Sequence, residues 1–195
     1  LKRYIAEAAA RIDKELEYAK QIQLSALPTN FPDGDDYSIY AQMIAAKEVG
    51  GDFYDFYKLN DTTVAFLAAD VSGKGIPAAM FMMTAKTIIK DLAESGMPVN
   101  EIFTKANQKL CENNESGMFV TAWMGVLTIS TGDFEFVNAG HNPQLLMNTD
   151  AYEWIDATPG FVLAGLEGIP YTSQQMKLKQ GARIFLYTDG VTEAQ

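Results

Sequence analysis

The chain has 195 residues, 48% of them hydrophobic, and a formal net charge of −10 at pH 7. This length predicts one domain with a short extension, and the apolar content excludes a disordered chain. The acidic balance argues against a nucleic-acid groove, which needs a basic surface. The single cysteine, Cys111, excludes an intrachain disulfide and favours a reducing, cytoplasmic setting for the domain. No apolar run reaches the about 20 residues of a membrane helix, although an upstream segment of the parent protein could still attach it to a membrane.

Residues 1–27 are predicted to form a helix, because apolar residues recur at spacings of three and four and the first proline is Pro28. Two interpretations stay open. The helix either packs on its own domain or serves as a linker and dimerisation helix that continues upstream into a sensor domain. Because the chain begins at Leu1, we expect a fragment with two parts, the helix 1–27 and a catalytic domain over 28–195.

Beyond a turn-rich connector, the pattern changes to strands, then two helices, then strands again. This order predicts an α+β fold with two packed, mainly antiparallel sheets and helices outside them, not alternating βαβ units. The predicted helices cover residues 76–95 and 98–113. The predicted strands cover residues 37–45, 52–59, 63–69, 119–129, 134–138, 144–147, 152–155, 172–178 and 183–187.

Three acidic motifs each place a carboxylate beside glycine at the end of a predicted strand. Asp52 follows Gly50-Gly51, Asp70 ends a buried apolar strand, and Asp189 precedes Gly190. A single Asp-Gly pair usually marks a turn, but three in one domain favour a site.

The chemistry of these motifs points to divalent cations. A carboxylate at the rim of a core needs a cation, a partner or a proton, because burial of its charge is costly. The chain has only three arginines, and its one histidine and one cysteine are too few for an ordinary zinc site. Clustered oxygen ligands therefore indicate hard cations such as Mg²⁺ or Mn²⁺.

Four motifs in order carry a family resemblance: the runs Glu48–Asp55, Asp70–Ala79, Asn138–Pro143 and Tyr187–Ala194. Together they resemble the PPM-type metal-dependent protein serine/threonine phosphatases. The closest branch is the bacterial one typified by stage II sporulation protein E and the phosphatases of sigma-factor signalling. The resemblance covers about residues 20–195, including the end of the first helix.

The resemblance implies an α-β-β-α sandwich with two Mn²⁺ or Mg²⁺ ions at one end. It assigns Asp70 to the carboxylate that bridges both ions. Asp52 and the backbone carbonyl of Val71 would bind one ion, and Asp189 the other. These three aspartates are the expected catalytic residues. Asp55 is expected to support the metal ligands from outside.

Two glycines are also expected to support the ligands, Gly51 beside Asp52 and Gly190 beside Asp189. The family carries a further metal-binding Asp beyond the last motif. This chain stops at Gln195, so we expect the domain to lack its C-terminal segment.

Other family positions differ here. Eukaryotic relatives carry a histidine after the bridging Asp and an arginine near the first motif that grips phosphate, where this chain has Ser72 and Lys47. Lys47 and Lys74 are therefore candidate phosphate contacts, although solvated lysines are the simpler interpretation. His141 could serve as a proton shuttle, but the resemblance assigns its Gly-His-Asn-Pro turn a structural role.

The resulting hypothesis is hydrolysis of phosphoserine or phosphothreonine on a signalling partner by attack of a metal-bridging hydroxide. The resemblance suggests a phosphorylated anti-sigma-factor antagonist as this partner. Two alternatives stay open: a non-catalytic signalling module of the same fold, and a hydrolase of small phosphoesters.

Overall fold

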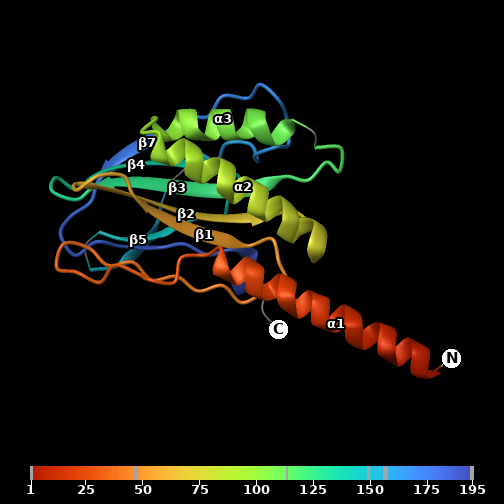
Figure 1. The fold of residues 1–195 in the computed structure, drawn as a ribbon. Helices are drawn as coiled ribbons and strands as arrows, with labels where there is room; N and C mark the ends of the chain where they lie inside the picture. The colour runs from red at the N-terminus through yellow and green to blue at the C-terminus, as the bar shows by residue number, and fades with distance from the viewer. Residues whose placement is uncertain (1, 46–47, 113, 149, 156–157, 194–195) are drawn as a thin grey trace.

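The computed structural model describes residues 2–45, 48–112, 114–148, 150–155 and 158–193. Helices α2 (Ile76–Glu94) and α3 (Val99–Cys111) lie over one face of a central sheet, and strand β5 (Leu145–Met147) lies on its other side (Figure 1). Helix α1 (Lys2–Ser25) projects away from this body. No helix in the described part of the chain is both long and apolar enough to span a bilayer.

The strands form two antiparallel sheets, as the sequence predicts. The larger sheet has the order β1-β2-β3-β4-β7, and the smaller one has the order β6-β5-β8. The bounds of the larger sheet are β1 Phe53–Lys58, β2 Thr63–Val71, β3 Val120–Thr128, β4 Asp133–Ala139 and β7 Gln174–Lys177. The smaller sheet adds β6 Tyr152–Trp154 and β8 Arg183–Phe185 to β5.

Strand alternation divides the buried residues into two clusters, one on each face of the larger sheet. The face below the helices contributes Leu67 and Met124, which belong to the same core cluster as Met82 of α2. The opposite face is aromatic, with Trp123 and a phenylalanine pair from β4 packed against apolar residues of the smaller sheet. This arrangement confirms the predicted α+β sandwich.

One predicted strand, residues 37–45, is wrong. Within the described residues of this segment the structure has a single isolated bridge, between Asp33 and Ser38. Tyr40 and Ile44 are 78% and 81% exposed. Alternating apolar residues predicted a strand, but a strand needs a neighbour that pairs its backbone along its length. This segment pairs only at its start, with residues 32–34, among the described residues.

Candidate metal centre

The structure brings together the three carboxylates that the sequence predicted. Asp70 is the penultimate residue of β2, and Asp52 immediately precedes β1. The pairing of Phe53 with Ala69 places these two aspartates side by side at one end of the hairpin. Asp189 begins α4 (Asp189–Thr192). One carboxylate oxygen from each of the three lies within 4.8 Å of the others.

The cluster concentrates negative charge without a protein counter-charge. Asp52 and Asp70 are half-buried, and Asp189 is exposed. Burial raises the pKa of Asp70 to about 7, and the neighbouring Asp52 charge acts in the same direction. Burial also raises the pKa of Asp52, while hydrogen bonds with Asp70 and Thr188 oppose the shift. Among the described residues, no ion pair involves any of the three.

One oxygen of this cluster lacks any partner. Oδ1 of Asp52 is buried and has no hydrogen-bond partner among the described residues. Buried polar atoms are normally hydrogen-bonded, so such an exception calls for an explanation such as an ion.

Gly51 allows the loop that carries Asp52 to press against the end of β2. A Cβ at this position would lie 2.6 Å from the carbonyl oxygen of Val71 and 3.2 Å from Oδ1 of Asp70. No side chain fits in that space, so the glycine lets the backbone approach both predicted ligands. Gly190 is less constrained, because a Cβ there would lie 3.5 Å from Oδ2 of Asp52, an ordinary contact.

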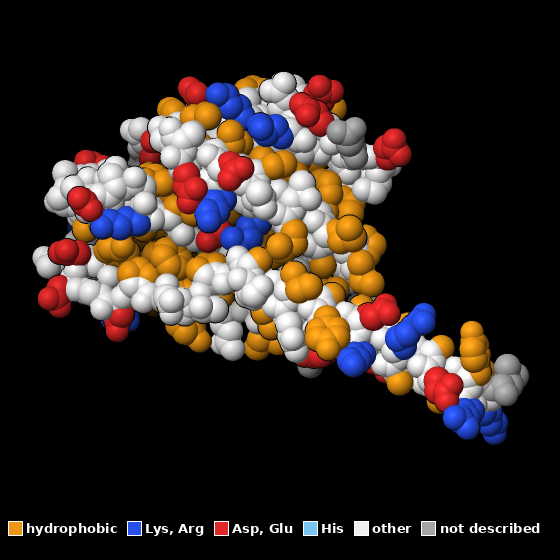
Figure 2. All heavy atoms as spheres, viewed as in Figure 1, with side chains coloured by type: hydrophobic (Ala, Val, Ile, Leu, Met, Phe, Trp, Pro, Cys, Tyr) orange, Lys and Arg blue, Asp and Glu red, His pale blue; other side chains and the backbone are white. Residues whose placement is uncertain are grey.

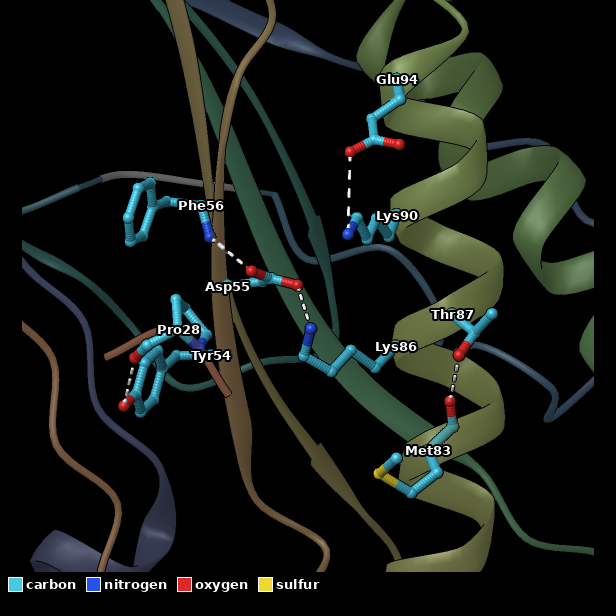
Figure 3. Close-up of polar contacts among 9 residues, drawn as sticks. All are labelled: Pro28, Tyr54, Asp55, Phe56, Met83, Lys86, Thr87, Lys90 and Glu94. Atoms are coloured by element: carbon cyan, nitrogen blue, oxygen red, sulfur yellow. Dashed lines mark hydrogen bonds and ion pairs between the residues drawn. The ribbon is translucent and has the colours of Figure 1, made fainter. Parts of the chain in front are cut away.

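Asp55 is paired with a lysine of the neighbouring helix. Its side chain points from β1 to α2, where it forms a buried ion pair with Lys86 (Figure 3). Its other oxygen, Oδ1, accepts a hydrogen bond of 2.9 Å from the amide of Phe56. None of its contacts among the described residues is with the three-carboxylate cluster, so its predicted support of the metal ligands stays a prediction.

The two candidate phosphate lysines gain no support from the structure. Lys47 lies outside the described residues. Lys74 is exposed, and no ion pair in the described part of the chain involves it. The hydroxyl of Ser72 accepts a hydrogen bond of 2.9 Å from the amide of Phe119, so it ties two loops together at this edge.

His141 lies behind the cluster in a buried turn. Its amide donates to Oδ1 of Asn138 at 2.7 Å, and its Nδ1 lies 3.0 Å from the hydroxyl of Thr121. Burial lowers the pKa of His141 to about 4, with the Tyr187 backbone acting in the opposite direction. The neutral imidazole is therefore favoured, and the structural role suggested for His141 stays a prediction.

Sequence reasoning missed Thr188, although a signal was present. A threonine just before a helix normally caps it by accepting a hydrogen bond from a backbone amide of the first turn. Thr188 occupies that position in α4 but makes no such bond. Its hydroxyl instead acts on the Asp52 carboxylate, where hydrogen bonding lowers the pKa of Asp52.

The sequence matches the model of a known protein family. The model described as Stage II sporulation protein E (SpoIIE) matches residues 60–195, more than half of the chain. The chain belongs to the SpoIIE family. It is 30% identical over 185 residues to the phosphoserine phosphatase RsbU of Bacillus subtilis and 30% identical over 208 residues to the protein IcfG of Synechocystis. These alignments include 94% and 93% of the chain but only 55% and 33% of the relatives.

Solved structures support the same placement of this SpoIIE-family domain. The RsbU and RsbW domains of Rv1364c from Mycobacterium tuberculosis align with a TM-score of 0.68 at 26% identity, over 76% of this chain and 41% of that one. The SiaA-PP2C domain of Pseudomonas aeruginosa aligns with a TM-score of 0.76 over 95% of this chain and 74% of that one. At 18% identity, the second likeness concerns the fold alone.

Proposed function

We propose that this domain is a metal-dependent protein phosphatase that hydrolyses phosphoserine or phosphothreonine on a signalling protein. The observation that carries the proposal is the meeting of Asp52, Asp70 and Asp189 within 4.8 Å, without a basic partner among the described residues. Family membership adds support, because the relatives RsbU and RsbP of Bacillus subtilis are phosphoserine phosphatases.

The residues present fit a pair of divalent cations. The donors are all carboxylate or carbonyl oxygens, which Mg²⁺ and Mn²⁺ prefer. The raised pKa values of Asp52 and Asp70 and the unpartnered Oδ1 of Asp52 are what a site built around external positive charge would have. Asp70 would contact both ions, Asp52 and the Val71 carbonyl one of them, and Asp189 the other. One solved relative, RsbX, was crystallised in complex with magnesium.

The chain's own contribution is rigid placement. When bound, two such ions supply activation of a water nucleophile and neutralisation of charge on the phosphoryl oxygens. Asp70 is held on β2, an interior strand of the sheet that pairs with β1 and β3. Asp52 is fixed against it by the strand register and by Gly51. Asp189 arrives from the short helix α4 and remains exposed, so this side of the cluster is open to a protein substrate.

The direct test compares Asp70→Asn with wild type on p-nitrophenyl phosphate, with and without Mn²⁺ or Mg²⁺. We expect wild-type turnover only with added metal, and a loss for Asp70→Asn larger than the about 10–100-fold typical of residues that merely support metal ligands. Asp61→Asn is the matched control, because Asp61 is exposed and pairs with Lys58 at 2.9 Å far along the hairpin. Equal rates for wild type and Asp70→Asn, with unchanged circular dichroism, would remove the metal mechanism.

We also propose that the substrate is a phosphorylated anti-sigma-factor antagonist, because the motifs resemble the phosphatases of sigma-factor signalling and the relatives RsbU and RsbP are phosphoserine phosphatases. Rates on a serine-phosphorylated protein of this class should exceed those on sugar phosphates and nucleotides. The reverse ranking would favour a small-phosphoester hydrolase. No turnover of either class, with metal bound, would favour a non-catalytic signalling module.

A dimer through α1, driven by an upstream sensor, is a further proposal. Ile5 and Ile12 lie one heptad apart on α1 and are 57% and 53% exposed, although apolar residues at this spacing normally meet a partner helix. Sedimentation should give a dimer that becomes monomeric when residues 1–20 are deleted. Two monomeric proteins would remove this proposal.

A further inference from the structure

Gln23 is the only residue of α1 that is buried, although it is polar. It is 4% exposed, whereas Gln21 on the same helix is exposed. Figure 1 shows α1 leaving the body of the domain, so its last turns are where it meets the fold. A buried amide at this junction needs partners for both its donor and its acceptor.

Both ends of the Gln23 amide bind one residue, Gly50. Nε2 donates to the carbonyl of Gly50 at 2.6 Å, and Oε1 accepts from the amide of Gly50 at 3.1 Å. Nε2 also lies 3.8 Å from the sulfur of Met82 on α2. Gly50 makes no backbone–backbone hydrogen bond outside regular strands among the described residues. The side chain of Gln23 therefore takes the place of a neighbouring strand at this point.

Gly50 is two residues from Asp52 in the sequence. The intervening Gly51 lies against the Val71 carbonyl and the Asp70 carboxylate, with no room for a side chain. A shift of Gly50 would therefore move Gly51, and with it the distance between Asp52 and Asp70. Because ligand placement decides metal affinity, a residue that fixes Gly50 acts on the metal site from outside it.

The rest of the junction is loosely filled. A cavity of about 220 Å³ lies between α1 and the segment before Asp52, lined by Lys20, Gln23, Leu24 and residues 43–45 and 48. Figure 2 shows apolar side chains at the base of α1, where it meets the body. Leu27, two residues beyond α1, is buried in the core and anchors the end of the helix, while the paired hydrogen bonds of Gln23 connect the helix to the loop that carries Asp52.

We infer that Gln23 is a positioning residue, which couples the end of α1 to the Asp52 loop and thereby sets the affinity of the cluster for divalent metal. This inference rests on the proposed function for its biological meaning, but its measurement does not require turnover. Movement of α1 would reach the Asp52 loop through the two hydrogen bonds between Gln23 and Gly50.

The experiment measures Mn²⁺ binding by titration calorimetry for wild type, Gln23→Met and Gln23→Glu. Gln23→Met keeps the length of the side chain and removes both hydrogen bonds. We expect its Kd for Mn²⁺ to rise by about 10–100-fold, the effect typical of groups that orient metal ligands. Gln23→Glu keeps an acceptor for the Gly50 amide, so its Kd for Mn²⁺ should lie between those of wild type and Gln23→Met. Gln21→Met, on the exposed side of α1, is the matched control and should bind as wild type does.

Stability in EDTA, followed by urea unfolding, separates positioning from simple anchoring. If Gln23→Met lowers stability but keeps its Kd for Mn²⁺ within twofold of wild type, the inference is overturned. Should Gln23→Met fail to fold, the Kd of Gln23→Glu decides in the same way. If wild type binds Mn²⁺ but hydrolyses no phosphoester, the proposed function fails while the inference is still tested. If wild type binds no Mn²⁺, both fail.

Discussion

Asp52 and Asp55 lie three residues apart in the sequence, yet only Asp55 forms an ion pair among the described residues. Asp55 points to the helix face of β1 and meets Lys86, with side-chain exposures of 7% and 11%. Asp52 lies at the end of the hairpin beside two further carboxylates and no cation among the described residues. The first charge is neutralised within the fold. The second has no counter-charge among the described residues, as the proposed binding of an external ion requires.

The surroundings of the internal pair underline the difference. Asp55 and Lys86 line a cavity of about 310 Å³ between β1, α2 and the segment that follows α1. Lys90 and Glu94, one and two turns further along α2, form a looser, exposed pair at 3.8 Å (Figure 3). Exposed pairs of this kind contribute little, but a buried pair is sensitive to the loss of one partner.

Breaking the internal pair should give the largest change in stability. Lys86→Met leaves the Asp55 carboxylate buried without a counter-charge, so we expect a loss of about 3–5 kcal/mol in the free energy of unfolding. Urea denaturation measures it. The double variant Asp55→Leu with Lys86→Met should recover most of the loss, because it removes both charges. Lys90→Met is the control, and a loss equal to that of Lys86→Met would contradict the distinction between the two pairs.

Removing the charge of Asp52 should change stability in the opposite direction from removing the charge of Asp55. In EDTA, Asp52→Asn removes the cost of burying this charge and its repulsion from Asp189, so stability should rise, by about 1 kcal/mol or less because the site is partly solvated. Asp55→Asn should lower it under the same conditions. Urea midpoints of the two variants check this contrast, and shifts of the same sign would show that the two environments are not distinct. Added Mn²⁺ should stabilise wild type but not Asp52→Asn.

A further expected effect is a dependence of stability on pH in the metal-free protein. The pKa of Asp70 is raised from 3.8 to about 7. Its protonated form therefore stabilises the fold fully below pH 3.8, and this contribution is lost as the pH rises through 7. The contribution of His141 to stability has the opposite pH dependence. Because its pKa is lowered to about 4, this contribution rises with pH between about 4 and 6.5. Subtracting the Asp70→Asn curve isolates the Asp70 contribution, which should decline between pH 5 and pH 8.

The affinity of the site for metal should change with pH in the opposite direction from this contribution to stability. Protons compete with cations for the carboxylates, so affinity for Mn²⁺ should rise with pH over the same range. A Kd for Mn²⁺ that does not change between pH 6 and pH 8 would contradict the pKa assigned to Asp70.

Local pattern was enough to predict most elements and to single out the three aspartates that the structure brings together. Asp70 could be placed because a long apolar run identifies β2, and Asp52 because glycines mark the turn before β1. The same reasoning wrongly predicted a strand over residues 37–45, because alternation shows which side chains share a face but does not supply a partner strand. The sequence could not pair Asp55 with Lys86 either, because that contact depends on how α2 is rotated against the sheet.

The sequence signal for Gln23 was present but easy to misjudge. Gln23 continues the apolar stripe of α1, where a polar residue indicates either an exposed position or a specific buried partner. Only the three-dimensional fold shows that the partner is a backbone near Asp52. Helical periodicity identifies such a position, but not what it binds.

The position of Asp189 has a consequence for how the domain comes apart. Asp52 and Asp70 belong to the first hairpin, whereas Asp189 stands at the last described helix, after every strand of both sheets. Any cation shared among them would join the first hairpin of the larger sheet to the segment that follows the last strand of the smaller sheet. Amide exchange in β8 and in β1 should therefore slow together when metal is added, so that the two sheets open as one unit instead of separately.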